Sequence, residues 1–492
     1  MRMIIGVDLG TQTCRSIMFD EDGRKIAASS ASYDLKYVKP RWVEQDPNDW
    51  WNAVKTTLRN VMMKSKASPT DINAISFSSQ ANALVLLDGD GEPVYPVISW
   101  LDTRSEKEVE FLRERLTEEN IYKTTGMILA PGFSPPKILW VKRNLPSIFS
   151  KIRKIVFTED YIIYKLADEF AIDYSLISFS MLFDVNKACW AHDILDTIGV
   201  TPDMFSKPYP SGTPIGELTA EVADEIGLKR GTPIIVGGHD QCCAAVGAGV
   251  IEHGMVLNSI GTAQATLCVS DKPFHDSKMR VLRYIHALPE RKWVLLRTIS
   301  SAGILLRWFC ENFCSAEAEV AKGMETSPYS LLDREAEAIE PGSEGLFVIP
   351  FFDEAEGVIY GLSLSHGKPH LYRALLESIG FEVRRSIDII EDLGITVRDI
   401  RMVGGGAKSL LWRKIISNQT NKTISVPRET EAAALGAAIL AGVGAKVYKD
   451  VYDGVKNAVK IIDSEKPEED IVAIYDSAFK KYLEIVNRLR KS

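Results

Sequence analysis

Short apolar runs alternate with helical hydrophobic patterns along most of the chain, which indicates an α/β protein. The first apolar runs lie at 3–7, 15–19 and 24–28, and stretches that contain aspartate and glycine separate them. Such residues favour tight turns, so this region predicts an antiparallel β-meander. The stretch 47–64 carries apolar side chains at helical spacing and predicts a helix, and a strand is expected at 72–77.

A similar succession begins again in the middle of the chain. A strand is expected at 233–236, followed by two glycines and a helical stretch at 240–250. Two further strands, 255–260 and 265–269, flank a Gly-Thr turn like the first turn of the chain. Two such units predict a duplicated architecture, with a domain boundary near residue 250.

Composition narrows the class of protein. The 492 residues suggest two or three domains, and 46% apolar with 25% charged residues are ordinary for a soluble globular protein. The net charge of −8 argues against a nucleic-acid binder that relies on bulk positive charge. No run of about 18 apolar residues occurs, so no membrane span is expected. The sequence does not start with the apolar core of a signal peptide, and its seven scattered cysteines are typical of reduced thiols, so we expect a cytoplasmic protein.

The first turn of the chain carries candidate chemistry. Asp8 ends an apolar strand, where an unpaired carboxylate is unfavourable. Gly10, Thr11, Gln12 and Thr13 follow, and glycine lets a ligand approach the backbone while amides and hydroxyls donate to phosphate oxygens. A divalent ion such as Mg²⁺ would relieve the repulsion between the carboxylate and phosphates. The alternative is that Asp8 caps a turn.

Two more glycine-containing turns point the same way. Gly261 and Thr262 repeat the strand–Gly-Thr–strand pattern and could bind the same phosphates. The glycines at 404–406 follow an apolar run and precede a helical pattern, an order typical of nucleotide-binding turns. This segment is neither a P-loop nor a dinucleotide fingerprint. The alternative is a tight strand–helix turn without a ligand.

Asp240 is the candidate general base. It follows a strand and two glycines at the start of a helical stretch, and a helix N-terminus favours an ionised carboxylate. Kinases of other folds use an aspartate to accept the proton of the attacking hydroxyl. The alternative is an ordinary N-cap. His239 beside it is interpreted as a structural donor.

Two polar segments of the N-terminal half suit a polyhydroxylated ligand. The first is Ser78-Ser79-Gln80-Ala81-Asn82-Ala83, and the second is Trp100-Leu101-Asp102-Thr103-Arg104. Amide and charged groups can bond to hydroxyls, while an indole ring covers a C–H face. The alternative for the second segment is a loop with an Asp–Arg pair on the surface.

Two longer motifs carry a family resemblance. The first is the stretch 132–141, centred on Lys137-x-x-Trp140. The second is the stretch 357–362, followed after seven residues by the stretch 370–377. Together with the turns described above, these motifs resemble the FGGY carbohydrate kinases.

The resemblance covers nearly the whole chain, from about Ile4 to about Gly442. It implies an α/β fold of two ribonuclease-H-like domains of the actin and hexokinase ATPase type, with an interdomain cleft. We therefore expect an N-terminal domain at 1–250 with the sugar site and first phosphate loop, a C-terminal domain at 251–445 with the nucleotide site, and a helical extension at 446–492. Within that extension an apolar stripe predicts a packed amphipathic helix at 471–491. The residues of the stripe are Ile471, Ile474, Tyr475, Ala478, Tyr482, Leu483 and Val486.

The resemblance also implies the roles of individual residues, with ATP and Mg²⁺ as cofactors. Asp240 is the expected catalytic base, and Asp8 is the second expected catalytic residue and the Mg²⁺ ligand. The expected nucleotide-binding residues are Gly10, Thr11, Gln12, Thr13, Gly261, Thr262, Gly303, Gly405, Gly406 and Ala407. The expected sugar-binding residues are Gln80, Ala81, Asn82, Trp100, Asp102, Asp240 and Gln241.

The identity of the sugar is less constrained. The pattern is most similar to xylulokinase-like members, which usually carry Gln-Met-His-Gly where this chain has Gln-Ala-Asn-Ala at 80–83. We expect ATP-dependent phosphorylation of a ketose such as D-xylulose or another pentulose. A tetrulose, a ketohexose or glycerol stays open, although the Arg-Glu pair of glycerol kinases has no counterpart here. The alternatives from other classes are a non-enzymatic, actin-like ATP-binding switch and a nicotinamide-dependent dehydrogenase. We expect no nucleic-acid or membrane partner, and a homodimer is left open.

Overall fold

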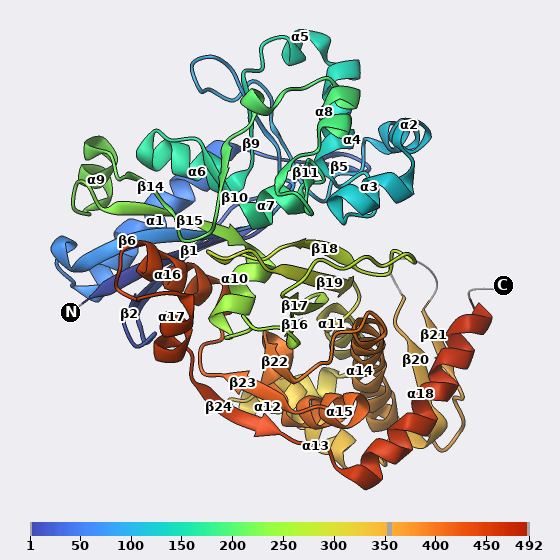
Figure 1. Ribbon diagram of the computed structural model, residues 1–492. Helices are drawn as coiled ribbons and strands as arrows, with labels where there is room; N and C mark the ends of the chain where they lie inside the picture. Colours follow the sequence, from blue (N-terminus) through green and yellow to red (C-terminus); the bar gives the residue numbers. More distant parts are fainter. Residues whose placement is uncertain (1, 352–356, 490–492) are drawn as a thin grey trace. The chain divides into compact units, whose positions relative to one another are not determined.

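The computed structural model describes residues 2–351 and 357–489 (Figure 1). Contacts divide the chain into two compact units. Unit 1 comprises Met1–Ile251, Val269–Leu295 and Glu431–Lys460, and unit 2 comprises Glu252–Cys268, Leu296–Thr430 and Ile461–Ser492. The domain boundaries at 250 and 445 stay predictions, because this division follows contacts and places the segment Glu431–Lys460 in unit 1.

Unit 1 is built on a six-stranded mixed sheet in the order β14-β15-β6-β1-β2-β3. The bounds, in that order, are Pro214–Glu217, Pro233–His239, Ile72–Ser79, Met3–Leu9, Thr13–Asp20 and Lys25–Ser32. Strands β1, β2 and β3 pair antiparallel, whereas β6 lies parallel to both β1 and β15. The predicted N-terminal meander and the strands at 72–77 and 233–236 are therefore confirmed.

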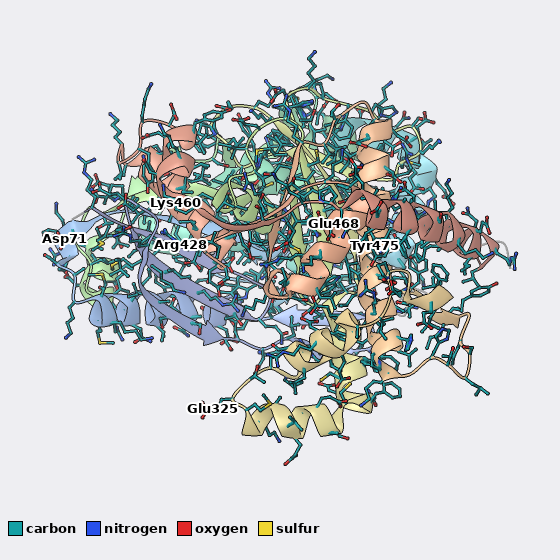
Figure 2. The ribbon with its side chains drawn as sticks, turned by 90° about the horizontal axis from the view of Figure 1, so that it is seen from below. Asp71, Glu325, Arg428, Lys460, Glu468 and Tyr475 are labelled. Atoms are coloured by element: carbon teal, nitrogen blue, oxygen red, sulfur yellow. The ribbon has the colours of Figure 1, made fainter. Side chains whose placement is uncertain are left out.

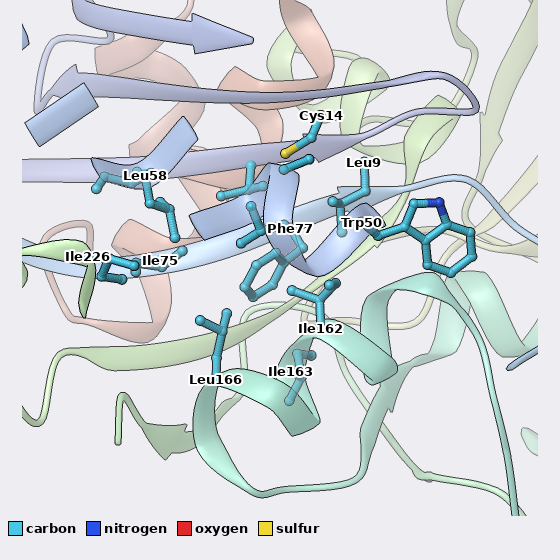
Figure 3. Close-up of a cluster of buried hydrophobic side chains, with 14 of the residues drawn as sticks. Leu9, Cys14, Trp50, Leu58, Ile75, Phe77, Ile162, Ile163, Leu166 and Ile226 are labelled. Carbon is cyan, nitrogen blue, oxygen red and sulfur yellow. The ribbon is translucent and has the colours of Figure 1, made fainter. Parts of the chain in front are cut away.

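The alternation of side chains along β1 directs the packing of this sheet. Ile5, Val7 and Leu9 join one hydrophobic cluster, to which helices α1 (Pro47–Ser65) and α6 (Thr158–Ala167) also contribute (Figure 3). Figure 3 draws Ile162, Ile163 and Leu166 of α6 as part of this cluster, with Phe77 and Ile75 of β6.

The opposite face of β1 lies against helix α16 (Ala432–Gly444). Ile4 joins the second cluster with residues of this helix. At Gly6 the helix comes so close that a Cβ atom would lie 1.9 Å from the carbonyl oxygen of Ala434. Asp8 has the same parity along the strand as Ile4 and Gly6, so its side chain leaves the sheet on the α16 face.

Unit 2 repeats the strand arrangement of unit 1. Its strands follow the order β17-β16-β22-β23-β24, with bounds Gln264–Ser270, Met255–Ile260, Asp399–Val403, Ile424–Pro427 and Ile461–Glu465. Strand β16 pairs antiparallel with β17 and parallel with β22, just as β1 pairs antiparallel with β2 and parallel with β6. The predicted duplication is confirmed at the level of strand pairing.

Helix α18 (Glu469–Leu489) confirms the predicted C-terminal amphipathic helix, of which residues 490 and 491 lie outside the described residues. Tyr475, labelled in Figure 2, is buried and donates from its hydroxyl to Glu377 at 2.8 Å. Ile474 was expected on the apolar stripe, but it is 43% exposed, because the buried face of the helix follows Tyr475, Phe479 and Tyr482. Over the described residues, no helix has both the length and the apolar character needed to cross a membrane.

Candidate active site

Asp8 lies at the end of β1 with its side chain 14% exposed. Ser78 on the neighbouring strand β6 donates to Asp8 Oδ1 at 2.8 Å, and Arg15 Nη1 lies 3.8 Å from Oδ2. The pKa of Asp8 is raised to about 6. Burial is the main cause and the nearby carboxylate of Asp240 adds to it, while Ser78 and Arg15 act in the opposite direction. An aspartate with this pKa is mostly ionised at neutral pH but is poorly compensated by the protein, which favours the approach of a cation.

Asp240 begins helix α10 (Asp240–Gly247), directly after strand β15. The backbone N–H of Gln241 donates to Asp240 Oδ1 at 2.6 Å, and His239 Nε2 lies 3.2 Å from the same oxygen. The side chain is one-third exposed, at 33%. The dense packing around it raises the pKa of Asp240 to about 6, so the carboxylate is ionised and basic near neutral pH, as a general base requires.

His239 is placed as a structural residue, in line with the interpretation from the sequence. Its ring stacks on Phe179 with centroids 4.5 Å apart, and its Nδ1 lies 3.1 Å from the hydroxyl of Tyr284. Burial lowers the pKa of His239 to about 3, so the ring is neutral at physiological pH.

The turn between β1 and β2 is held by contacts to its backbone and to one hydroxyl. Gly10 N–H donates to the carbonyl of Thr13 at 3.0 Å, and Tyr33 donates to the carbonyl of Gly10 at 2.5 Å. Trp100 Nε1 donates to the Thr11 hydroxyl at 3.0 Å. Gln12, at the tip, is exposed. The turn is therefore a fixed loop that links the predicted phosphate segment to Trp100, one of the predicted sugar-binding residues.

The segment Gln80-Ala81-Asn82 is buried and lies just beyond the end of β6. Asn82 adopts a left-handed conformation with φ 58°, and its Oδ1 accepts a hydrogen bond from Ser134 at 2.6 Å. Lys137 donates to the carbonyls of Asn82 at 2.9 Å and Ser99 at 2.7 Å. The Lys137-x-x-Trp140 signature thus has a physical role, because its lysine joins the two polar segments that were predicted to bind sugar.

Two amide side chains of this region have buried polar atoms without a hydrogen-bond partner among the described residues. Gln80 is 3% exposed, yet neither its Nε2 nor its Oε1 has a hydrogen bond. The Oε1 atom of Gln241, beside the candidate base, is likewise buried and unbonded. Buried polar groups are usually hydrogen-bonded, so these atoms are suited to a polar ligand.

Asp102 and Arg104 form a buried pair, which corrects the alternative of a surface pair. Both side chains are fully buried, 2.7 Å apart at Arg104 Nη2 and Asp102 Oδ2. Asp102 also accepts a hydrogen bond from the backbone of Val43 at 2.6 Å, and Arg104 bonds Glu44 at 2.9 Å and lies over the Trp42 ring. Asp102 therefore has a packing role here, and its contact with sugar stays a prediction.

The predicted nucleotide-binding residues of unit 2 meet in one cavity of about 440 Å³. Gly261, Thr262, Gly303, Gly405 and Gly406 all line it. Gly303 N–H donates to the carbonyl of Gly261 at 3.1 Å, and a Cβ atom on Gly303 would lie 2.2 Å from that carbonyl oxygen. Ala407 is not among the lining residues; it is buried, and its carbonyl accepts a hydrogen bond from Arg413 at 3.3 Å.

Other residues of this cavity carried no signal in the sequence. Tyr329, Asp333 and Trp412 line it as well, and Tyr372 donates to Asp333 Oδ1 at 3.0 Å. In unit 1, Ser78 begins the first predicted sugar segment, but its contact with Asp8 was not predicted, although a polar residue at the carboxyl end of a strand parallel to β1 is a usable signal.

The acidic residues of unit 1 could bind a metal ion only together with a ligand that supplies further oxygen atoms. No group of three or more histidine, cysteine, aspartate or glutamate side chains suited to a metal occurs in the described part of the chain. Mg²⁺ typically takes one or two carboxylates and completes its shell with phosphate oxygens and water. Asp8, with its raised pKa and with Asp240 nearby, provides that kind of incomplete site.

Phosphate-binding glycine turns and an aspartate tuned to accept a proton are the parts required by a kinase that acts on an alcohol. The profile of the FGGY family of carbohydrate kinases, N-terminal domain, matches residues 3–247, and the profile of its C-terminal domain matches residues 256–445. The chain therefore belongs to the FGGY family of carbohydrate kinases and is a sugar kinase.

Individual relatives differ in their sugar. The chain is 31% identical over 483 residues to the gluconokinase of Bacillus subtilis, covering 96% of this chain and 93% of that protein. It is 30% identical over 461 residues to the xylulose kinase of Escherichia coli, covering 92% of each. The crystal structure of ligand-bound xylulose kinase from Lactobacillus acidophilus superposes with a TM-score of 0.91 at 25% identity, covering 100% of this chain and 99% of that one. The non-enzymatic switch and the dehydrogenase are thereby set aside.

Proposed function

We propose that this enzyme transfers the terminal phosphoryl group of ATP to a hydroxyl of a ketose, such as D-xylulose or another pentulose. The observation that carries the proposal is Asp240, a carboxylate of raised pKa, one-third exposed, at the start of a helix. Nucleotide is assigned to the glycine-lined cavity of unit 2, and sugar to the polar segments around Gln80 and Trp100.

The proposed chemistry uses few side chains. Asp240 accepts the proton of the attacking hydroxyl as that oxygen bonds to the terminal phosphorus and the bond from this phosphorus to the ADP oxygen breaks, which releases ADP. Asp8 would hold Mg²⁺ together with phosphate oxygens, and the ion would neutralise the charge of the transferring group. The unbonded amide of Gln80 and the unbonded Oε1 atom of Gln241 are offered to sugar hydroxyls.

Charge favours a neutral sugar over a sugar acid. The two cations that flank the sugar segments are both committed to protein groups: Lys137 to the carbonyls of Asn82 and Ser99, and Arg104 to Asp102 and Glu44. A carboxylate ligand such as gluconate would need a cation of its own. Gluconate is nevertheless the second candidate, because a relative as similar as the xylulose kinases carries that name.

A panel of substrates tests the proposal. ADP release is measured with ketoses, polyols, aldoses and gluconate, and phosphorus NMR assigns the position of the phosphate in the product. We expect the largest kcat/KM with a pentulose. Preference for gluconate would replace the ketose assignment, and no response to any compound would overturn the proposed function.

A further inference from the structure

The end of strand β15, which leads directly into Asp240, is held by two buried carboxyl groups. Glu159, in the first turn of α6, accepts a hydrogen bond at 2.6 Å from the backbone N–H of Gly237. Asp173, at the end of β10 (Ala171–Asp173), accepts one from the Ser175 hydroxyl, and Ser175 Oγ in turn accepts one from the backbone N–H of His239 at 2.8 Å. Both carboxyl groups thus act on the residues just before Asp240.

Glycine leaves the support of this segment to its backbone. A Cβ atom at Gly237 would lie 1.7 Å from the carbonyl oxygen of Phe77, and one at Gly238 would lie 2.5 Å from the Cβ of Ala287, so side chains cannot occupy these positions. Gly238 pairs with strand β6, and the hydrogen bond from Gly237 to Glu159 adds to that support. Two adjacent glycines are flexible, and these backbone contacts limit that freedom.

The two carboxyl groups are buried close enough to influence each other. Glu159 and Asp173 are fully buried, Glu159 Oε2 has no hydrogen-bond partner among the described residues, and the charge of Asp173 raises the pKa of Glu159. A proton held between the two groups would relieve the repulsion that two ionised carboxylates exert on each other. Burial raises the pKa of Glu159 well above its usual value and that of Asp173 to about 6.

Among the residues that the structure describes, no cation faces this pair of carboxyl groups. The titratable side chains around it are Asp160 on α6, His239 on β15, Cys242 and Cys243 on α10, and Tyr284 on β18 (Leu282–Ile285). The histidine is neutral, since its pKa is lowered to about 3. A shared proton is therefore the means by which the two acids coexist in this region.

We propose that Glu159 and Asp173 form a carboxylic acid–carboxylate pair that shares one proton and, through Gly237 and His239, positions Asp240 for phosphoryl transfer. They are positioning residues, because they act on the base through the backbone. This inference rests on the proposed role of Asp240.

Kinetics of two variants test the positioning. Glu159→Leu removes the acceptor for Gly237, and we expect kcat to fall roughly tenfold to a hundredfold, since small misplacement of a catalytic group has effects of that order. The KM for ATP should stay unchanged. Glu159→Gln keeps an acceptor for Gly237 and a donor for Asp173, so its kcat should stay near that of the wild type. A wild-type kcat in Glu159→Leu would overturn the positioning role.

The matched control is Asp160→Asn. Asp160 is the next residue on the same helix and is also fully buried. Its hydrogen bonds join it to Phe157 and Ser206 rather than to the end of strand β15. We expect this variant to keep its kcat even if its stability falls. An equal fall in kcat for Asp160→Asn and Glu159→Leu would show that the loss comes from general destabilisation, and it would overturn the proposal.

Thermal stability tests the shared proton without any activity assay. Glu159 keeps its proton in the folded state but ionises at about pH 4.3 once unfolded. Unfolding therefore releases a proton above that pH, and the wild type loses stability as pH rises toward the folded-state pKa of Glu159. Glutamine carries no such proton, so the Tm of Glu159→Gln minus that of the wild type should grow by a few degrees between pH 5 and pH 8.

The pH dependence of Tm and the assay of sugar phosphorylation distinguish failure of the shared proton from failure of the proposed function. A Tm difference that does not change with pH would overturn the shared proton. If the wild type phosphorylates no sugar, the proposed function fails, while the pH-dependent Tm difference still decides whether the acid pair exists.

Discussion

The two units place the same strand–Gly-Thr–strand turn in different chemical settings. Leu9-Gly10-Thr11 in unit 1 corresponds to Ile260-Gly261-Thr262 in unit 2. The two stretches differ first in the residue that precedes them, which is Asp8 in unit 1 and Ser259 in unit 2. Across the hairpin, Asp8 pairs with Arg15, whereas Ser259 pairs with Ala265.

Their surroundings extend the difference. The turn of unit 1 lies among side-chain contacts and next to two carboxyl groups of raised pKa, Asp8 and Asp240. The turn of unit 2 lines a cavity of about 440 Å³ together with Gly303, Gly405 and Gly406. The same strand–turn–strand scaffold thus occurs twice, with carboxyl groups beside it in unit 1 and a glycine-lined cavity beside it in unit 2.

The largest expected effect is the loss of the proposed general base in unit 1. Asp240→Asn keeps the size of the side chain but removes the base, and we expect kcat to fall roughly 10²–10⁴-fold. ATP affinity, assigned to unit 2, should not change. Steady-state kinetics and isothermal titration calorimetry measure the two quantities, and a near-normal kcat would remove Asp240 from the mechanism.

The second effect concerns stability in unit 1. Asp102→Ala leaves the buried Arg104 with Glu44 as its remaining acidic partner. Removing one member of a buried ion pair is strongly destabilising, so we expect the free energy of unfolding to fall by about 3 kcal/mol. Denaturant unfolding measures this loss. A stable variant with a raised KM for sugar would instead support the sugar contact predicted for Asp102.

A matched pair of glycine substitutions sharpens the picture of unit 2. A Cβ atom at Gly406 would lie 2.8 Å from Ile260 and 3.0 Å from the Trp412 ring, whereas one at Gly405 has its nearest neighbour at 3.9 Å. Gly406→Ala should weaken ATP binding by about 1–3 kcal/mol through overpacking, with a smaller effect in Gly405→Ala. Calorimetric titration with ATP compares them, and equal losses would contradict the assigned geometry.

The smallest effect is the response to pH. The pKa of Asp240 is raised to about 6, and the ionised form is the active base. We expect kcat/KM to fall to between about a half and a quarter near pH 6 and at least tenfold at pH 5, because Asp8, whose pKa is also about 6, protonates together with the base. A profile that stays flat down to pH 5 would show that neither carboxylate titrates as described.

Hydrophobic periodicity and turn residues predicted much of the fold, because both depend on interactions between residues that are close in the sequence. The meander, the strand after α1 and the C-terminal helix follow from apolar spacing. Ile474 was wrongly assigned to the buried stripe, since adjacent positions on a helix differ by 100° and only the partner surface decides which side is covered. The Asp102–Arg104 pair shows the same limit, because burial depends on the strands and rings around it.

By itself the sequence determined which side chains could do chemistry: the acids after strands, the glycines at turns and the amides near a tryptophan. Tertiary structure decided which of them are available. It bonded Asp102 fully, left the amide of Gln80 unbonded, gathered Gly261, Gly303 and Gly405 at one cavity, and placed Glu159 behind Gly237. The reason is that hydrogen bonding and desolvation act between residues far apart in the chain, whereas a sequence pattern reports only neighbours.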